Sequence, residues 1–242
     1  MTRPLTAILF DIDDTLFPST AFADKARQSA VEAMVDAGLD IEVESAMQEL
    51  HAVVQEFSSN YGHHFDQLVV RLGGHLREGV HKALVVAAGV RAYHETKAHL
   101  KPHPDAVVVL EALRPTDLLR GVLTNGLTIK QAEKLVRLGM QHYFSPGALF
   151  ISEDLGVAKP HPRIFQIACE TMGTVPSEVL YIGDNPIKDV DAAHEAGLIT
   201  CLRRGAGKHS MAVGAHAPDF EVETLDELLP VLREQFGVAI DA

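Results

Sequence analysis

A short apolar segment that ends in a cluster of carboxylates constrains this chain more than any other feature. Residues 5–10 read Leu-Thr-Ala-Ile-Leu-Phe, and Asp11, Asp13 and Asp14 follow at once. An apolar run of this length predicts a strand buried on both faces, as in parallel sheets. The carboxylates would then lie at the carboxyl end of that strand, which is the edge where open α/β sheets bind ligands.

Carboxylates held this close together favour a bound cation. Like charges raise one another's pKa unless a cation lies among them. Two unit charges about 4 Å apart repel by about 4 kcal/mol at an effective dielectric constant near 20. Mg²⁺, a hard cation that prefers oxygen ligands, matches this chemistry. An Asp-rich turn is the alternative interpretation, because Asp is also favoured in turns and at helix N-caps.

Composition excludes several classes of partner. The chain has 242 residues, of which 47% are apolar, and this length allows one large domain or a core with an insertion. Its formal net charge of −12 argues against nucleic acid binding. Cys169 and Cys201 are too few for a disulfide framework, and both are predicted to be buried thiols. We find no signal peptide before the first strand and no apolar run of membrane-spanning length, so a cytoplasmic protein without a membrane partner is expected.

Hydrophobic periodicity divides the chain into a helical block and an alternating part. Helical patterns without a strand candidate occupy the first block, at 21–37, 43–57, 65–72 and 80–100. Further strands are predicted at 119–124, 148–152, 179–183, 199–202 and 220–222. Helices are predicted between and after them, at 105–113, 127–138, 162–172, 189–196 and 225–236. Strands separated by helices predict a parallel sheet with right-handed crossovers.

We therefore predict an α/β fold, a doubly wound (Rossmann-like) parallel sheet, with a small all-helical domain inserted after the first strand. The predicted boundaries are 1–18 plus 101–242 for the α/β core and 19–100 for the helical domain.

Three later segments carry polar residues at or beyond predicted strand ends. Thr124-Asn125 ends one strand, Lys159 lies in the loop beyond another, and Asp184 ends a third, with Asp189 five residues later. Each segment alone is typical of a turn, an exposed loop lysine or an N-cap. The carboxyl ends of parallel strands lie side by side, however, so these residues are expected to meet Asp11 at one site.

Taken together, these motifs resemble the haloacid dehalogenase (HAD) superfamily of phosphohydrolases. They occur in the family's order: Asp11-x-Asp13-x-Thr15, Thr124-Asn125, Lys159, and Gly183-Asp184 with Asp189. The helical insertion is similar to the family's all-helical cap, which lies between the first and second motifs. No motif is legible within the insertion itself.

The resemblance implies a two-step phosphoryl transfer. Asp11 would attack phosphorus and form an aspartyl-phosphate. Asp13 would protonate the leaving alkoxide and then take a proton from the hydrolytic water. Mg²⁺ would be bound by Asp11, the backbone carbonyl of Asp13, and Asp184.

The resemblance also assigns binding and supporting roles. Thr124, the backbone N–H of Asn125, and Lys159 would bind the phosphate oxygens, and Lys159 would keep Asp11 ionised and in place. The remaining motif residues would have supporting roles: Asp189 would assist the metal or orient Lys159, and Asp14 and Thr15 would secure the loop.

Basic residues outside the motifs have less specific interpretations. His103 and His161 flank the expected site and are candidates for substrate contact. Arg203 and Arg204, after the last core strand, are expected to be a solvated pair. The histidines of the insertion are expected at the solvated surface rather than at a zinc site: His51, His63, His64, His75, His81, His94 and His99.

The function predicted from these observations is a Mg²⁺-dependent phosphatase that acts on a small phosphorylated metabolite, of the sugar phosphate or nucleotide type, as a monomer or homodimer. A phosphosugar mutase uses the same Asp pair, and a dehalogenase attacks carbon without needing Asp13 or a metal. A phospho-accepting receiver domain has a similar acidic site but lacks Asp13 and the inserted helices. A non-catalytic binding protein on the same fold also stays open.

Overall fold

The computed structural model describes residues 4–58, 61–205 and 207–240. The chain divides into two compact units. One unit comprises Met1–Thr20 with Lys101–Ala242, and the other comprises Ala21–Leu100. The first unit is called the α/β unit below, and the second the helical unit.

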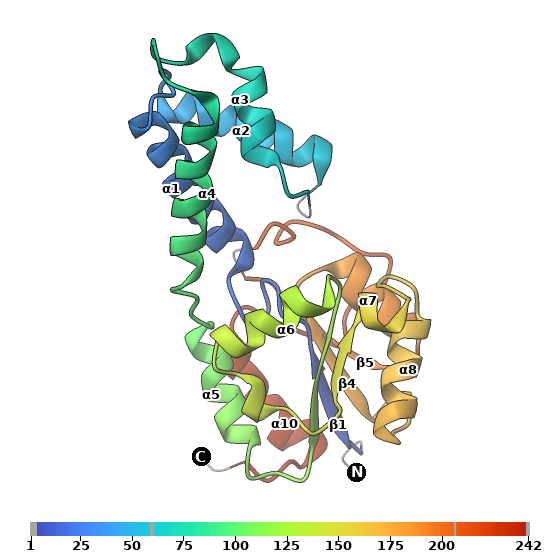
Figure 1. The fold of residues 1–242 in the computed structure, drawn as a ribbon. Helices are drawn as coiled ribbons and strands as arrows, with labels where there is room; N and C mark the ends of the chain where they lie inside the picture. The colour runs from blue at the N-terminus through green and yellow to red at the C-terminus, as the bar shows by residue number, and fades with distance from the viewer. Residues whose placement is uncertain (1–3, 59–60, 206, 241–242) are drawn as a thin grey trace. The chain divides into compact units, whose positions relative to one another are not determined.

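A six-stranded sheet forms the centre of the α/β unit (Figure 1). Its order is β3-β2-β1-β4-β5-β6, and every neighbouring pair is parallel. The strands are β1 (Ala7–Phe10), β2 (Leu119–Thr124), β3 (Leu149–Ile151), β4 (Val179–Gly183), β5 (Ile199–Arg203) and β6 (Phe220–Val222). All four residues of β1 are fully buried, as expected for a strand covered on both faces. The predicted doubly wound α/β fold is confirmed.

The strand order reverses between β1 and β4, and this position determines where a ligand can bind. From β1 the chain moves outward through β2 and β3, and then returns to place β4 on the other side of β1. Phe10 is paired with Val122 of β2 and Ile182 of β4. The crevice at the carboxyl ends beside such a reversal is where these sheets bind ligands.

Helices cover both faces of this sheet. They are α5 (Pro104–Leu113), α6 (Thr128–Arg137), α7 (Ser152–Leu155), α8 (Arg163–Met172), α9 (Ala192–Glu195) and α10 (Leu228–Phe236). Phe165 of α8 and Ala192 of α9 share one apolar core with Leu9 of β1. Helices α5 and α10 contact each other and lie on the opposite side of the sheet from α8 (Figure 1).

The segment after β4 differs from the predicted helix 189–196. A π-helical turn, Pro186–Asp191, comes first, and regular α-helix begins only at Ala192. The Asn185 side chain starts this turn by accepting hydrogen bonds from the backbone N–H groups of Ile187 (3.1 Å) and Lys188 (3.0 Å). Helical structure therefore begins three residues earlier than predicted, and Asp189 lies inside it rather than at its start.

The helical unit contains the inserted helices. Its elements are α1 (Ser19–Asp36, which begins in the α/β unit), α2 (Val43–Phe57), α3 (His64–Arg71), a 3₁₀ turn (Gly73–His75) and α4 (Lys82–Lys97). Met34, Leu50, Leu68 and Val85 are fully buried in its core. Gly89 lets α4 approach α1, since a Cβ at this position would lie 2.7 Å from the Met34 sulfur. Within the described residues, no helix has the length and apolar character needed to cross a membrane.

Candidate active site

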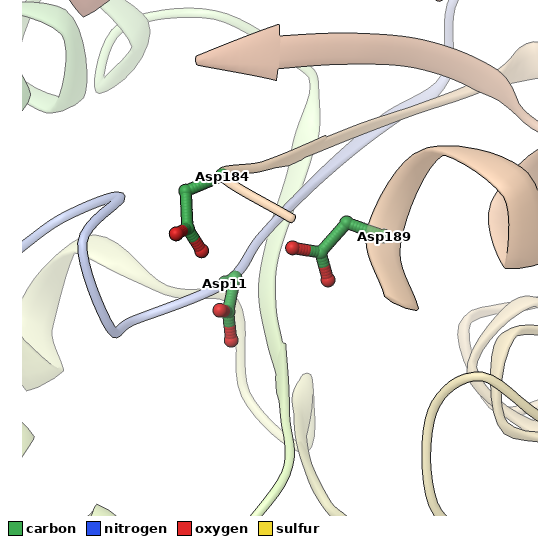
Figure 2. Close-up of side chains that lie close together, drawn as sticks. All are labelled: Asp11, Asp184 and Asp189. Carbon is green, nitrogen blue, oxygen red and sulfur yellow. The ribbon is translucent and has the colours of Figure 1, made fainter. Parts of the chain in front are cut away.

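Three carboxylates meet at the point where the strand order reverses. Asp11 follows β1, Asp184 follows β4, and Asp189 lies in the π-helical turn; one oxygen from each lies within 4.8 Å of the others. Figure 2 shows that the three side chains lie close together. The backbone N–H of Asp11 donates to Ile182 C=O (2.9 Å), which places Asp11 directly beside the end of β4.

A buried lysine balances part of this negative charge. Lys159 Nζ lies 3.1 Å from Asp11 Oδ1 and 2.6 Å from Asp189 Oδ1. It also donates to the Tyr181 hydroxyl (2.8 Å), which in turn donates to Asp189 Oδ1 (3.0 Å). Burial opposes the charge on Lys159, but the Asp11 and Asp189 carboxylates hold its pKa above the usual value, so the ammonium stays charged. Asp189 thus orients Lys159 toward Asp11.

One lysine does not neutralise three carboxylates. Burial, with the charges of Asp189 and Asp11, raises the pKa of Asp184 to about 8. Burial also raises the pKa of Asp11 to about 6, although Lys159 opposes this shift. Within the described residues, Asp184 Oδ2 is buried and has no hydrogen-bond partner. An unpartnered buried carboxylate oxygen beside two further carboxylates is the donor set that a hard divalent cation requires.

The Gly183-Asp184 sequence has a steric basis. A Cβ at Gly183 would lie 2.6 Å from the Cβ of Asp189, closer than side-chain atoms approach one another. Asp189 Oδ2 accepts a hydrogen bond from the backbone N–H of Asn185 (2.9 Å), which holds its carboxylate over the end of β4. Glycine at 183 therefore makes room for Asp189 beneath the turn that carries Asp184.

The second motif also contacts Asp11. Thr124 is buried at the end of β2. Its hydroxyl lies near enough to the Asp11 carboxylate to lower the pKa of that group, against the larger effect of burial. The Asn125 side chain forms a reciprocal pair with the backbone of Lys159: Nδ2 donates to its C=O (2.7 Å), and Oδ1 accepts from its N–H (2.8 Å). The loops after β2 and β3 are therefore joined at the residues that were expected to bind phosphate.

Asp14 and Thr15 form the turn that follows β1. Asp14 adopts a left-handed conformation (φ 54°), and its carboxylate accepts hydrogen bonds from Thr20 N (2.9 Å) and Thr20 Oγ1 (2.5 Å). Both Asp14 and Thr15 are buried. These contacts fix the path of the chain just beyond Asp13.

The expectation that Arg203 is solvated is wrong. Only 4% of this residue is exposed, because β5 carries it inward beneath the same turn. Its guanidinium donates to Thr15 C=O and forms an ion pair with Asp105 (2.8 Å). Arg204 points to the surface and pairs with Glu221 (2.9 Å). Arg203 is the last residue of β5, in which every residue is buried, whereas Arg204 follows the end of the strand.

Asp13 lies apart from the carboxylate cluster. Its oxygens accept hydrogen bonds from two residues of α6, Lys134 (2.5 Å) and Gln131 (3.2 Å). Burial alone would raise the pKa of Asp13, but the Lys134 ammonium and these hydrogen bonds bring it below its usual value.

The remaining candidates are more peripheral. His103 is half-buried, and burial lowers its pKa, while His161 is exposed. Cys169 and Cys201 are buried free thiols, as predicted. In the helical unit His64 is half-buried and the other predicted surface histidines are exposed.

Sequence reasoning missed three site residues: Tyr181, Lys134 and Gln131. A tyrosine inside a strand buried on both faces needs a partner for its hydroxyl, which is a usable signal for Tyr181. Gln131 and Lys134 are three residues apart in the helix after Thr124-Asn125-Gly126, so they share a helix face. Nothing in that spacing indicates that the face would meet Asp13.

A model of the haloacid dehalogenase-like hydrolases matches residues 5–197. The chain belongs to this family. A glyceraldehyde 3-phosphate phosphatase from Methanopyrus kandleri is 43% identical to this HAD hydrolase over 95% of the chain and 98% of the relative. One from Methanocaldococcus jannaschii is 38% identical over 95% and 97%, respectively. The crystal structure of a HAD phosphatase from Thermococcus onnurineus shares the fold, with a TM-score of 0.65 and 24% identity over 96% of this chain and 99% of that one. The predicted family and enzyme class, a phosphoric monoester hydrolase, are confirmed.

Proposed function

We propose that this HAD hydrolase releases phosphate from a small sugar phosphate, with Mg²⁺ as its cofactor and an aspartyl-phosphate on Asp11 as its intermediate. The observation that carries the proposal is the cluster of Asp11, Asp184 and Asp189 with Lys159 between two of them. The relatives named as glyceraldehyde 3-phosphate phosphatases support a triose phosphate as the substrate.

The residues that would hold Mg²⁺ are Asp11, Asp184 and the backbone carbonyl of Asp13. The unpartnered Asp184 Oδ2 supports this assignment, and Asp189 is already bonded to Lys159 and Asn185. A bound divalent cation would neutralise charge on the transferring phosphoryl group. Without it, a phosphate dianion would meet three buried carboxylates and one ammonium, which is a repulsive environment.

Asp11 would act as the nucleophile. A bond forms between one of its carboxylate oxygens and phosphorus as the bond from phosphorus to the sugar oxygen breaks. Asp13 in its protonated form gives a proton to that sugar oxygen. In the second step the resulting carboxylate takes a proton from the water that attacks the aspartyl-phosphate, which restores the protonated form. Thr124, the Asn125 N–H and Lys159 would bind the phosphoryl oxygens. The ion pair of Asp11 with Lys159 supports an ionised nucleophile.

The helical unit would serve as a cap that selects the substrate and excludes water, with the predicted boundaries of 1–18 plus 101–242 for the core and 19–100 for the cap. The family resemblance and the separate core of the helical unit support this role.

The test is hydrolysis of glyceraldehyde 3-phosphate with Mg²⁺, with EDTA, and by Asp11→Asn. We expect phosphate release that requires Mg²⁺ and falls at least about a thousandfold in the variant, because the substituted amide is not a nucleophile. Mass spectrometry of acid-quenched wild-type protein should detect a phosphate adduct on Asp11. Turnover that survives EDTA, or that Asp11→Asn retains, would contradict the proposal.

A further inference from the structure

The Asp13 carboxyl group is held by two side chains from α6. Lys134 Nζ donates to Oδ1 (2.5 Å), and Gln131 Nε2 donates to Oδ2 (3.2 Å). Each oxygen therefore has its own donor, which fixes the rotation of the carboxyl group as well as its position. The two donors are three residues apart and project from one face of the helix.

The surrounding chain is shaped to accommodate Gln131. This residue is only 6% exposed, and Nε2 also donates to Asn125 C=O (2.8 Å), so it joins the turn after β2 to Asp13. Gly126 has a φ of 149°, and a Cβ there would lie 2.6 Å from Gln131 Nε2. The glycine that follows Thr124-Asn125 thus leaves the space through which Gln131 reaches Asp13.

Lys134 is distinguished from its neighbours on the same helix. Its side chain is 21% exposed, whereas Lys130, one turn earlier, is exposed and is not among the donors to Asp13. Lys159 contacts Asp11 and Asp189, not Asp13. Within the described residues, the nucleophile Asp11 is thus paired with Lys159, and Asp13, two positions beyond it, is paired with Lys134.

We propose that Lys134 is a positioning residue that acts through Asp13, holding its carboxyl group, together with Gln131, in the orientation needed to protonate the leaving sugar oxygen. The inference rests on the proposed function, in which the phosphorus–oxygen bond breaks while the proton moves from Asp13 to that oxygen. The Lys134 ammonium then faces the carboxylate that the transfer leaves behind.

This role has a consequence that a structural role does not share. An alkoxide leaves poorly and needs the proton, whereas p-nitrophenolate leaves without one. Loss of Lys134 should therefore impair hydrolysis of a sugar phosphate much more than hydrolysis of p-nitrophenyl phosphate. The value of kcat/KM reports the steps through release of the alcohol, so hydrolysis of the aspartyl-phosphate, which is common to both substrates, does not enter the comparison.

The experiment measures kcat/KM of the Mg²⁺-loaded enzyme for glyceraldehyde 3-phosphate and p-nitrophenyl phosphate. For Lys134→Met, we expect kcat/KM to fall at least about tenfold more for glyceraldehyde 3-phosphate than for p-nitrophenyl phosphate. A difference of this size lies within the range that general acid catalysis supplies. Lys130→Met is the matched control and should change neither value. Lys134→Arg should restore part of the loss, because it keeps a cation beside Asp13.

A double variant tests whether Lys134 acts through Asp13. In an Asp13→Asn background, Lys134→Met should cause little further loss on the sugar phosphate. Equal losses on both substrates, additive losses in the double variant, or no loss at all would overturn the inference while leaving the proposed function intact. A wild-type enzyme that hydrolyses neither substrate would instead contradict the proposed function, and this inference with it.

Discussion

At the scale of single residues, Arg203 and Arg204 show how burial determines the contribution of a charged side chain to stability. Arg203 is enclosed beneath the turn after β1, where it bonds to Thr15 C=O and pairs with Asp105. Asp105 also accepts a hydrogen bond from the backbone N–H of Leu225 (2.7 Å), so these contacts join residues 15, 105, 203 and 225. Arg204 is partly exposed and pairs with Glu221 at the surface.

We predict that Arg203→Met lowers the free energy of unfolding by about 3 kcal/mol, because it leaves the Asp105 carboxylate, whose side chain is only 13% exposed, without its cation. Arg204→Met should have a smaller effect on the free energy of unfolding, about 1 kcal/mol, because Arg204 and Glu221 are both accessible to solvent. Urea denaturation of the two variants checks both values. Similar effects of the two substitutions would show that burial does not distinguish these arginines.

At the scale of elements, β2 depends on a glycine in its interior. A Cβ at Gly121 would lie 2.6 Å from a Leu9 methyl group and 2.9 Å from Ala148 C=O. Gly121 is buried between β1 and β3, and the Ala148 carbonyl is backbone that cannot rotate away.

Gly121→Val should therefore destabilise the protein by about 1–3 kcal/mol, as overpacking a core typically does. Gly121→Ala should have a smaller effect, since it adds only one of the three carbon atoms. Thermal and urea unfolding of the pair provide the measurement. An unchanged midpoint for Gly121→Val would mean that β1 and β3 can separate at little cost.

The elements also show what the sequence could and could not predict. The strands were predictable because their apolar runs are buried on both faces, and residues 7–10 are fully buried. The π-helical turn before α9 was not, because it depends on the Asn185 side chain and on space beside Gly183, and neither has a periodic signal. The meeting of Asp11, Asp184 and Asp189 was predictable because the carboxyl ends of parallel strands lie at one edge of a sheet. The contacts of Asp13 with Lys134 and of Arg203 with Thr15 join residues more than 100 positions apart, and no local pattern reports them.

At the scale of the whole molecule, the chain combines a formal net charge of −12 with a buried carboxylate cluster. In the metal-free protein, burial and the neighbouring carboxylates raise the pKa of Asp184 to about 8, while burial raises that of Asp11 to about 6. The folded protein therefore binds protons at these groups more tightly than the unfolded chain does. A raised carboxyl pKa contributes stability at low pH, and that stability is lost as the pH rises through the folded-state value.

In EDTA, the contribution of Asp184 to the free energy of unfolding should fall by roughly 2–3 kcal/mol between pH 6 and pH 8.5. A bound divalent cation requires the ionised carboxylate, so added Mg²⁺ should raise the melting temperature more at pH 8.5 than at pH 6. Asp184→Asn removes the titrating group. This substitution should flatten the pH dependence of the melting temperature in EDTA. It should also abolish most of the increase in melting temperature that Mg²⁺ causes. Melting curves of both proteins across this pH range, with EDTA and with Mg²⁺, make the comparison. A Mg²⁺-induced shift that is larger at pH 6, or that Asp184→Asn leaves unchanged, would place the metal somewhere other than this cluster.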